Sequence, residues 1–336
     1  MILKNKPAIN TNENDISIII VNYKSWTHLQ KCLNSLEDID RDSFSFEVII
    51  VDNNSNDNKL DAFSKKFPTY KFVSNLDNYG FSSGNNFGAH RANGEFLLFL
   101  NPDTILEKKA LLAMLQLAKE NLDYGIVSCA KLNSVGKSEK EIRFFPKLST
   151  FYGITRAIYK RVNKSKLSQK FNETNDIIFP DWVSGSLIFI SKKWFDLVEG
   201  WDEDYWLYFE DVDLCKRITD AGGKIALTRN ASIIHNHGGS SRLNLKTSAL
   251  TKTEVIISKH VYINNHYYSN TRFLTHFIFL FFGLISKFFL GAIGLILFFI
   301  PKCYLQYIIF KNLIKYYINA LIKKTWIGER APNYLK

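Results

Sequence analysis

Short hydrophobic runs alternate with amphipathic segments along the first two thirds of the chain. The runs are rich in β-branched and aromatic side chains, as is typical of buried strands, and lie at residues 16–21, 47–52, 70–73, 96–100, 125–130 and 181–190. Apolar residues at helical spacing predict helices at 26–36, 80–91, 107–120, 192–198 and 211–221. A further helix is expected to end at about residue 67. Two further short strands are expected before His235. The alternation predicts an α/β fold with a mostly parallel sheet covered by helices on both faces.

Three segments depart from this alternation. Residues 1–14 form a polar, Asn-rich tail without the apolar core of a signal peptide. Residues 131–180 are polar, basic and weakly periodic, which predicts an excursion over the functional face of the sheet. Residues 246–336 are basic and hydrophobic. We therefore expect one α/β domain over residues 15–245 and a separate C-terminal segment.

The charge of the chain is concentrated in its C-terminal part. The formal net charge is +11, and residues 251–336 contribute +9 of it, with 11 Lys or Arg against 2 Asp or Glu. The basic balance therefore does not indicate a nucleic-acid groove. Because the excess lies on the most hydrophobic part of the chain, it points to an anionic membrane surface.

Two apolar runs at residues 277–286 and 288–300 are separated by Lys287. Together they exceed the ~20 residues that a membrane span needs. Lys and Arg flank both sides, so a single span would place one basic flank on the wrong side of the membrane. We therefore favour helices that lie in the cytoplasmic leaflet. The alternative, a buried helical cap on the preceding domain, leaves the basic flanks unexplained.

The cysteines agree with a cytoplasmic location. The four cysteines are scattered along the chain, and their spacing suggests neither a zinc site nor a disulfide framework. A reducing compartment fits this usage, and it also fits the polar character of residues 1–14.

Polar residues follow several of the predicted strands, at the edge of the sheet where α/β proteins bind ligands. Asp103 comes directly after the run at 96–100, with Asn101 beside it. This arrangement suits a divalent cation that bridges phosphate oxygens. The alternative is a turn in which Asp103 caps the next helix. Asp52 likewise follows a buried run, and its carboxylate would accept the imide N–H of a pyrimidine base or cap the next turn.

Glycines and asparagines interleave in the helix predicted at 80–91, at Gly80, Gly84, Asn85, Asn86 and Gly88. Small residues at a helix start would let a diphosphate approach its backbone N–H groups. They would also permit close packing of the helix on the sheet. The pattern lacks the GxGxxG spacing of a dinucleotide-binding site.

Two adjacent carboxylates, Glu210 and Asp211, follow an aromatic stretch that includes Trp206 and Tyr208. Aromatic surroundings desolvate a carboxylate and raise its pKa toward that of a working base. The alternative is that both carboxylates cap the next helix.

Two further polar positions have structural and functional interpretations. For Asp213 we favour an ion pair with Arg217, four residues on. His235 follows an apolar pair and would close a metal site with Asp103, although a lone histidine is more often structural. His237 has the same possibility with less support.

Seven motifs then occur in order: SIIIVNY at 17–23, VDNNS at 51–55, NYGFSSGNNFG at 78–88, LNPDT at 100–104, WVSGS at 182–186, YFEDVDLCKR at 208–217 and HNHGGS at 235–240. As a set they resemble family-2 glycosyltransferases, most of all the rhamnosyltransferase group. The resemblance implies a GT-A fold and an inverting sugar transfer from a nucleotide-diphosphate donor, assisted by Mg²⁺ or Mn²⁺.

The resemblance also implies roles for individual residues. It places Asp52 on the pyrimidine base and Asp103 on the metal, as the last carboxylate of the Asp-x-Asp motif, with Asn101 at the position of the first. His235 would complete the metal site. Asp211 would be the base that deprotonates the acceptor hydroxyl, supported by Glu210. The other expected donor contacts are Asn22, Asn54, Asn78, Gly80, Asn85, Asn86 and Asn101, and the expected sugar or acceptor contacts are Trp182, Trp206 and Tyr208.

The favoured function is an inverting glycosyltransferase that moves rhamnose or another hexose to a lipid-linked saccharide in surface polysaccharide synthesis. It would work at the inner face of the cell membrane, and residues 131–180 would face the acceptor. Two alternatives remain open from the sequence. A nucleotidyltransferase would share the nucleotide-binding half, although residues 22–25 are not the Gly- and Lys/Arg-rich loop it needs. A membrane-tethered carbohydrate-binding protein with a degenerate site is the other, because Asn101 replaces an expected Asp.

Overall fold

A computed structural model describes residues 14–139, 141, 143–151, 153–165, 167, 171–172, 174–236 and 244–335. Residues 1–13 of the predicted tail and His237 lie outside the described residues. The strands are β1 Asn14–Asn22, β2 Phe46–Asp52, β3 Lys71–Ser74, β4 Gly94–Leu100, β5 Thr104–Ile105, β6 Tyr124–Leu132, β7 Ile177–Ile178, β8 Leu187–Ser191 and β9 Lys224–His235. The helices of the same part of the chain are α1 Trp26–Glu37, α2 Leu60–Lys66, α3 Gly80–Ala89, α4 Lys108–Glu120, α5 Leu148–Phe151, α6 Gly153–Val162, α8 Lys192–Leu197, α9 Glu210–Asp220, α10 Leu245–His266, α11 Ser269–Ile296 and α12 Pro301–Lys323, with a 3₁₀ helix at Pro332–Leu335.

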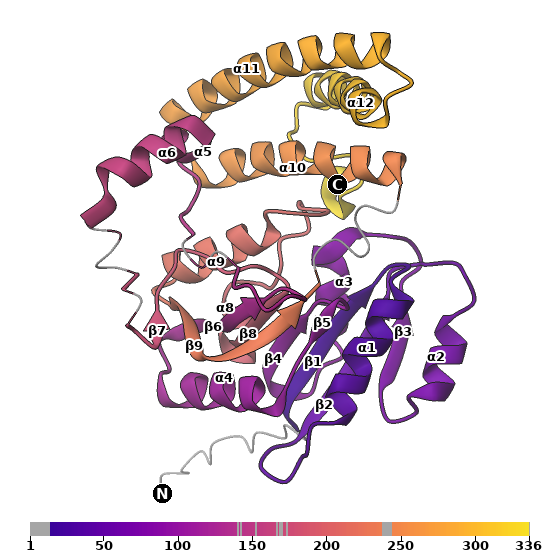
Figure 1. Ribbon diagram of the computed structural model, residues 1–336, viewed down its shortest axis with the longest axis vertical. Coiled ribbons are helices and arrows are strands. Elements are labelled where there is room, and N and C mark those ends of the chain that lie inside the picture. Colours follow the sequence, from indigo (N-terminus) through magenta and orange to yellow (C-terminus); the bar gives the residue numbers. More distant parts are fainter. Residues whose placement is uncertain are drawn as a thin grey trace, which may run out of the picture.

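The described strands form one sheet in the order β3-β2-β1-β4-β8-β6-β9-β5, with β7 pairing to β9 (Figure 1). Strands β1 to β4 are parallel to one another, and β6 is parallel to β9. The shorter strands β5, β7 and β8 run antiparallel to their neighbours. The predicted mostly parallel α/β sheet is thus confirmed, as a mixed sheet.

Helices cover both faces of the sheet, as predicted. Along β1, Ile18 and Ile20 point to the face covered by α1 and α4. Ile19, between them, points to the opposite face with residues of α3, α8 and α9. The period-two alternation of a strand explains why the whole run is apolar, since each face has its own core.

Two strands differ from the prediction. The run at 181–190 predicts one strand, but β8 begins at Leu187, after a loop that ends at Ser186. The two short strands expected before His235 are a single strand, β9. Its pairing with β6 shifts register where Cys129 pairs with Thr228 but Ala130 pairs with Ser232. The extra residues form a bulge, which interrupts the apolar pattern without ending the strand. In the bulge, Arg229 forms an ion pair of 2.9 Å with Glu141.

Helix α3 packs closely on β1 because it carries glycines there. A Cβ atom on Gly88 would lie 2.6 Å from Cγ2 of Ile19, and one on Gly84 would lie 2.9 Å from Cγ1 of Val21. For these two glycines the structure therefore matches the alternative of close helix packing.

The C-terminal helices form a layer beyond the α/β domain (Figure 1). Helix α10 is seated on that domain: Val261 and Tyr262 are buried with Tyr205 and Val212, and Ser258 Oγ donates a hydrogen bond of 3.0 Å to the carbonyl of Leu207. Helices α11 and α12 pair with each other farther out. Residues 246–266 thus contact the α/β domain directly.

We expect Gly88→Leu to lower the free energy of unfolding by about 1–3 kcal/mol, because the new side chain overpacks a buried site against β1. Leucine is a better helix former than glycine, so propensity works in the opposite direction. Gly153→Leu is the matched control, since a Cβ atom there meets nothing within 4 Å. Denaturant unfolding measures the free energy of unfolding of both variants. If Gly88→Leu were as stable as the control, this packing would be contradicted.

Candidate active site

Asp52 lies at the edge of the sheet where β1, β2 and β3 end together. It pairs in register with Asn22 of β1 and with Ser74 of β3. The buried Asn22 side chain donates to Asp52 Oδ1 at 3.3 Å, and the backbone N–H of Ser55 donates to Oδ2 at 3.0 Å. The carboxylate therefore caps the following turn, the structural alternative considered above. Because a carboxylate accepts up to four hydrogen bonds, it also keeps capacity for a ligand.

A network of asparagines connects the loops after β2 and β3. Asn53 Nδ2 donates to Asn78 Oδ1 at 3.0 Å and to the carbonyl of Gly80 at 2.8 Å, and Asn75 Nδ2 donates to Asn53 Oδ1 at 2.8 Å. Asn54 donates to a backbone carbonyl at 3.2 Å, and its φ is +58°, a conformation that asparagine tolerates. Asn53 and Asn75 were not predicted as site residues, although the Asn-rich loop was the signal for them.

Contacts between Gly80 and Trp206 join the asparagine network to the segment before α9. Gly80 has φ +89°, and a Cβ atom there would overlap the carbonyl oxygen of Trp206. The indole N–H of Trp206 donates to the Asn78 carbonyl at 3.0 Å, and the side chain is 8% exposed. The polar groups of Gly80, Asn78 and Trp206 thus bind the protein itself in this structure. Their contacts with donor and sugar stay predictions.

Asn85 and Asn86 of α3 also use their side chains within the protein. Asn85 is buried, and its Nδ2 donates to the carbonyl of Phe81 at 3.0 Å. Asn86 exchanges two hydrogen bonds with the backbone of Trp201, of 2.8 and 3.0 Å. They hold the helix start and the segment around Trp201 in place, and their contact with a donor stays a prediction.

Asp103 and His235 come together because β5 pairs with β9. Thr104 lies opposite His235 in that pairing, and Asp103 Oδ1 is 3.4 Å from His235 Nε2. The other ring nitrogen, Nδ1, is 2.8 Å from Glu139 Oε1. Burial disfavours the charged ring, but the contacts with Asp103 and Glu139 outweigh it and raise the pKa of His235.

A metal at this pair stays a prediction. Among the residues that the structure describes, no three or more His, Cys, Asp or Glu side chains are arranged to hold an ion. Asp103 Oδ1 is nevertheless buried and accepts no hydrogen bond within the described part of the chain. Asn101 forms the turn before it: its backbone N–H donates to the carbonyl of Ser186 at 3.1 Å, and its own carbonyl accepts from Thr104 Oγ1 at 2.6 Å.

Glu210 and Asp211 begin α9 after a sharp turn at Tyr208 and Phe209, which both have positive φ, +71° and +68°. Asp211 Oδ2 accepts from the N–H of Gly185 at 3.0 Å. Burial raises the pKa of Asp211, opposed by this hydrogen bond and by nearby cations. Burial and the charge of Asp211 raise the pKa of Glu210 well above its ordinary range.

The Asp213 ion pair is confirmed. Arg217 Nε lies 2.7 Å from Asp213 Oδ2, and His266 Nε2 of α10 lies 2.6 Å from Oδ1 of the same carboxylate. Asp213 therefore fastens α9 to α10.

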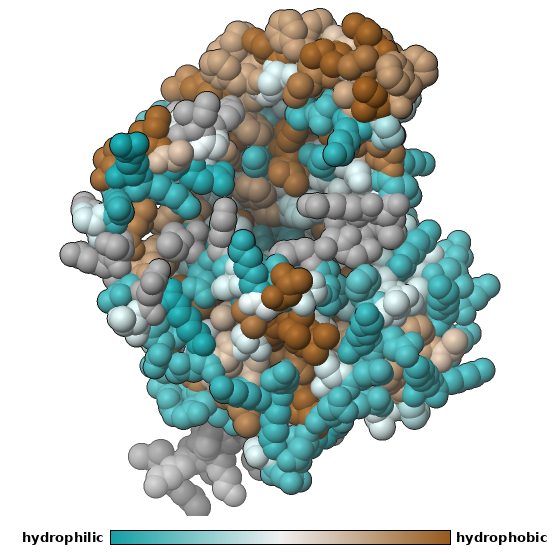
Figure 2. Space-filling model, in the orientation of Figure 1, coloured by the Kyte–Doolittle hydropathy of each residue, from teal (hydrophilic) through white to brown (hydrophobic). Residues whose placement is uncertain are grey.

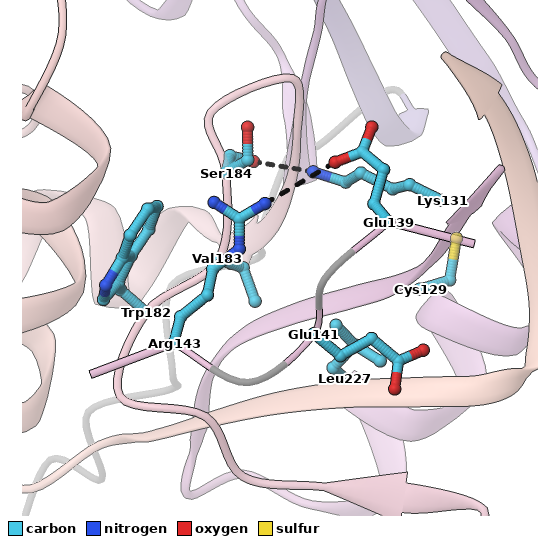
Figure 3. Close-up of a pocket in the computed structure, with 9 residues that line it drawn as sticks. All are labelled: Cys129, Lys131, Glu139, Glu141, Arg143, Trp182, Val183, Ser184 and Leu227. Atoms are coloured by element: carbon cyan, nitrogen blue, oxygen red, sulfur yellow. Dashed lines mark hydrogen bonds and ion pairs between the residues drawn. The ribbon is translucent and has the colours of Figure 1, made fainter. Parts of the chain in front are cut away.

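A small pocket lies beside Ser184, the residue before Gly185 (Figure 3). The Arg143 guanidinium lies 4.5 Å from the centroid of the Trp182 ring and 3.5 Å from Glu139. Lys131 Nζ donates to the carbonyl of Ser184 at 3.0 Å. The lining residues are Cys129, Lys131, Glu139, Glu141, Arg143, Trp182, Val183, Ser184 and Leu227. Part of the predicted excursion thus forms a wall of the pocket.

Lys131 and Arg143 were not predicted from the sequence. The signal for Lys131 was a charged residue within an apolar strand, β6. Arg143 had a weaker signal, its spacing of four residues from Glu139.

Comparisons with known proteins agree with this geometry. Residues 17–183 match the sequence model of the family described as Glycosyl transferase family 2. The rhamnosyltransferase WbbL of Escherichia coli (strain K12) is 27% identical over 229 residues, which cover 66% of this chain and 83% of that protein. An N-acetylglucosaminyl-diphospho-decaprenol L-rhamnosyltransferase of Mycobacterium tuberculosis (strain ATCC 25618 / H37Rv) is 23% identical over 240 residues, 67% of this chain and 77% of that protein.

Solved structures share the fold. A crystal structure of GalNAc-T7 with UDP, GalNAc and Mn²⁺ matches with a TM-score of 0.53 and 15% identity over 74% of this chain, which spans about half of that one (48%). Residues 1–349 of S. aureus TarS match with a TM-score of 0.51 and 19% identity, over 83% of this chain and 79% of that one. The fold is therefore of the GT-A type, as predicted. Of the functions that the sequence left open, the matches select sugar transfer, and the chain carries a domain of glycosyltransferase family 2.

Proposed function

We propose that this glycosyltransferase moves rhamnose or another hexose, with inversion, from a nucleotide-diphosphate donor to a lipid-linked saccharide. One observation carries the proposal: two consecutive residues, Gly185 and Ser186, contact Asp211 and the segment before Asp103. The N–H of Gly185 donates to Asp211, and the carbonyl of Ser186 accepts from the N–H of Asn101, two residues before Asp103. Asp211 and the segment that leads to Asp103 thus contact the same short loop.

The chemistry assigns a separate task to each end of the site. Asp52, at the ends of β1 and β2, would accept a hydrogen bond from the base of the donor. Asp211, whose raised pKa suits proton abstraction, takes the proton of the acceptor hydroxyl. The freed oxygen attacks the anomeric carbon opposite the departing diphosphate, through an oxocarbenium-like state comparable to that of glycoside hydrolysis. Inversion in one displacement needs no covalent nucleophile.

A divalent cation, Mg²⁺ or Mn²⁺, fits the pair formed by Asp103 and His235. The support is the buried Asp103 Oδ1, which accepts no hydrogen bond among the described residues and lies near an imidazole nitrogen. Carboxylate oxygens are the ligands that both cations prefer, and an imidazole nitrogen suits a transition metal such as Mn²⁺ better than it suits Mg²⁺. Bound there, the ion would stabilise negative charge on the leaving diphosphate. Glu139, on the far side of the ring, would orient His235.

The relatives support the choice of substrates. Two of them are named as rhamnosyltransferases, and the name of the mycobacterial one includes a diphospho-decaprenol, a lipid diphosphate. The GalNAc-T7 structure contains a nucleotide diphosphate, a sugar and Mn²⁺. We extend these chemistries to the present chain as a proposal.

The acceptor's lipid would be reached through α11 and α12. Of the described helices, α11 is long and apolar enough to cross a membrane, and an 18-residue stretch of it has a mean hydropathy of 2.1. Its small residues face α12: a Cβ atom on Gly294 would overlap the carbonyl oxygen of Cys303, and one on Gly291 would lie 3.0 Å from Cβ of Phe310. Its large side chains, such as Phe282 and Phe289, point outward and are 57% and 62% exposed.

This distribution is the reverse of that in a water-facing helix, and small residues at helix contacts are typical of membrane helices. Figure 2 shows hydrophobic residues gathered over α11 and α12, whereas the α/β domain is mostly hydrophilic around a smaller hydrophobic patch. Lys287 turns inward, where its Nζ donates to Gln306 Oε1 at 3.0 Å. We therefore propose that the two helices lie in the cytoplasmic leaflet of the membrane.

We expect Asp211→Asn to lower the rate of sugar transfer by roughly 10²-fold or more, because the base is lost. Donor binding should stay within about threefold, since Asp211 acts on the acceptor. A panel of nucleotide sugars identifies the donor, and product formation and calorimetry measure the two quantities. Asp220→Asn, exposed at the other end of the same helix, is the control. Transfer at the wild-type rate by Asp211→Asn would remove the base assignment.

We expect chelation to abolish transfer and added Mn²⁺ or Mg²⁺ to restore it. Glu139→Gln should raise the metal concentration needed for half-maximal activity by roughly 10–100-fold, because Glu139 orients His235. The exposed Glu107→Gln serves as the control. An enzyme that works equally well in chelator would contradict the metal site.

Flotation with vesicles that contain anionic lipid tests the membrane proposal. The wild-type protein should float, and the double variant Phe282→Asp/Phe289→Asp should lose at least roughly tenfold in binding, because charge is costly in hydrocarbon. Leu122→Asp is the matched control, since Leu122 is an exposed apolar residue of the α/β domain, 82% exposed. Equal flotation of all three proteins would show that α11 is not the membrane contact.

A further inference from the structure

A buried lysine lies at the centre of the site, and the mechanism above does not use it. Lys131 is the residue before the last of β6 and is 6% exposed. Its Nζ donates to the carbonyl of Ser184 at 3.0 Å (Figure 3). It also donates to Ser186 Oγ at 2.8 Å. Lysines are almost never this buried unless their charge is paired, so the position calls for an explanation.

Lys131 and Asp211 bind the same loop, residues 184–186. Ser184 accepts from Lys131, and the next residue, Gly185, donates its N–H to Asp211 Oδ2 at 3.0 Å. A Cβ atom on Gly185 would lie 3.4 Å from the Cβ of Asp211 and 3.3 Å from the Phe81 ring, so the loop packs tightly between α9 and α3. A shift of the loop would therefore move the hydrogen bond to Asp211.

The other end of the loop has a separate anchor. After Ser186 the chain enters β8, where Leu187 pairs with Leu100 of β4. This ladder holds the segment before Asp103 whether or not Lys131 is present. Lys131 adds hydrogen bonds to Ser184 and Ser186, the residues on either side of the Gly185 N–H that faces Asp211.

We propose that Lys131 is a positioning residue for the transfer reaction, whose ammonium group fixes the Ser184–Ser186 loop so that the Gly185 N–H orients the Asp211 carboxylate. The inference rests on the proposed role of Asp211 as the base. It assigns to Lys131 no contact with either substrate.

The charge of Lys131 acts on Asp211 in the same direction. Burial is the largest influence on the pKa of Asp211 and raises it, while the hydrogen bond from Gly185 and the charges of Arg143 and Lys131 lower it. Burial, and then the charge of Arg143, lowers the pKa of Lys131 to about 8, so its cation is present at neutral pH. The other charged or titratable groups that face the pair are Glu139 from the excursion, Cys129 of β6, Glu210 and Cys215 of α9, and His235 of β9.

The sign of the pH effect follows. Asp211 must be ionised to take a proton, so activity falls as the pH drops through its pKa. Removal of the neighbouring cation raises that pKa. The acidic limb of the kcat profile should therefore move to higher pH.

The test is Lys131→Met, which keeps an unbranched side chain but removes the charge and the donors. We expect kcat to fall at least roughly tenfold, because a shifted loop would misplace the catalytic carboxylate. Donor affinity should stay within about threefold, and the acidic limb should rise by roughly half a pH unit or more. Lys131→Arg should keep the acidic limb of the wild type, because arginine stays protonated.

The control is Lys224→Met. Lys224 begins β9, pairs in register with Tyr124 at the other end of β6, and is exposed in an ion pair with Asp123. It should leave kcat and both limbs unchanged. If Lys131→Met fails to fold, Ser186→Ala removes one acceptor of the ammonium group and should still lower kcat by roughly threefold at unchanged donor affinity.

The outcomes separate this inference from the proposed function. Asp211→Asn is measured alongside. If Asp211→Asn is inactive while Lys131→Met keeps the wild-type kcat and acidic limb, the positioning role is wrong and the base assignment stands. A lower thermal midpoint in Lys131→Met without a shift of the limb would show a purely structural lysine and would also overturn the inference. If Asp211→Asn is active, the proposed base itself is wrong.

Discussion

The site depends first on parallel pairing. Strands β1, β2 and β3 run side by side in register, so that Asn22, Asp52 and Ser74 end at the same level. Parallel strands need crossover connections, and each crossover here supplies a helix and a polar loop to the same edge. The hydrogen bonds among Asn53, Asn75 and Asn78 then join loops that are about 25 residues apart in the sequence. Without that register the asparagines would not meet.

The antiparallel strands bring the second half of the site to this edge. β8 lies between β4 and β6, and its entry loop reaches both Asn101 and Asp211. β9 returns His235 to Asp103 through its pairing with β5. Each contact joins residues far apart in sequence, and each depends on backbone pairing. The candidate site is thus positioned by a mixed sheet: parallel strands β1 to β3 align the asparagine loops, and the antiparallel pairings of β8 and β5 bring in the remaining polar side chains.

The sequence allowed much of this arrangement to be predicted, and its omissions have a common cause. Buried runs, helix spacing and the Asp213–Arg217 pair depend on neighbours within a few residues, so pattern reading finds them. The bulge in β9, the Lys131 contacts and the inward role of Asn86 depend on partners brought in from elsewhere. A polar residue in a strand indicates that a partner exists, but the sequence does not identify that partner. The same limit explains why the sheet was predicted as mostly parallel without the position of β8.

The packing of α10 on the α/β domain affects which acceptors can react. Ser258 and Tyr262 hold this helix on the segment that leads to α9, while its far end continues into the apolar pair α11 and α12. If that pair rests in a lipid leaflet as proposed, the elevation of Asp211 above the lipid is set by rigid contacts. A carrier whose glycan is one sugar longer or shorter would then bring its terminal hydroxyl to the wrong level, so acceptor choice would follow reach from the bilayer as well as the shape of the pocket.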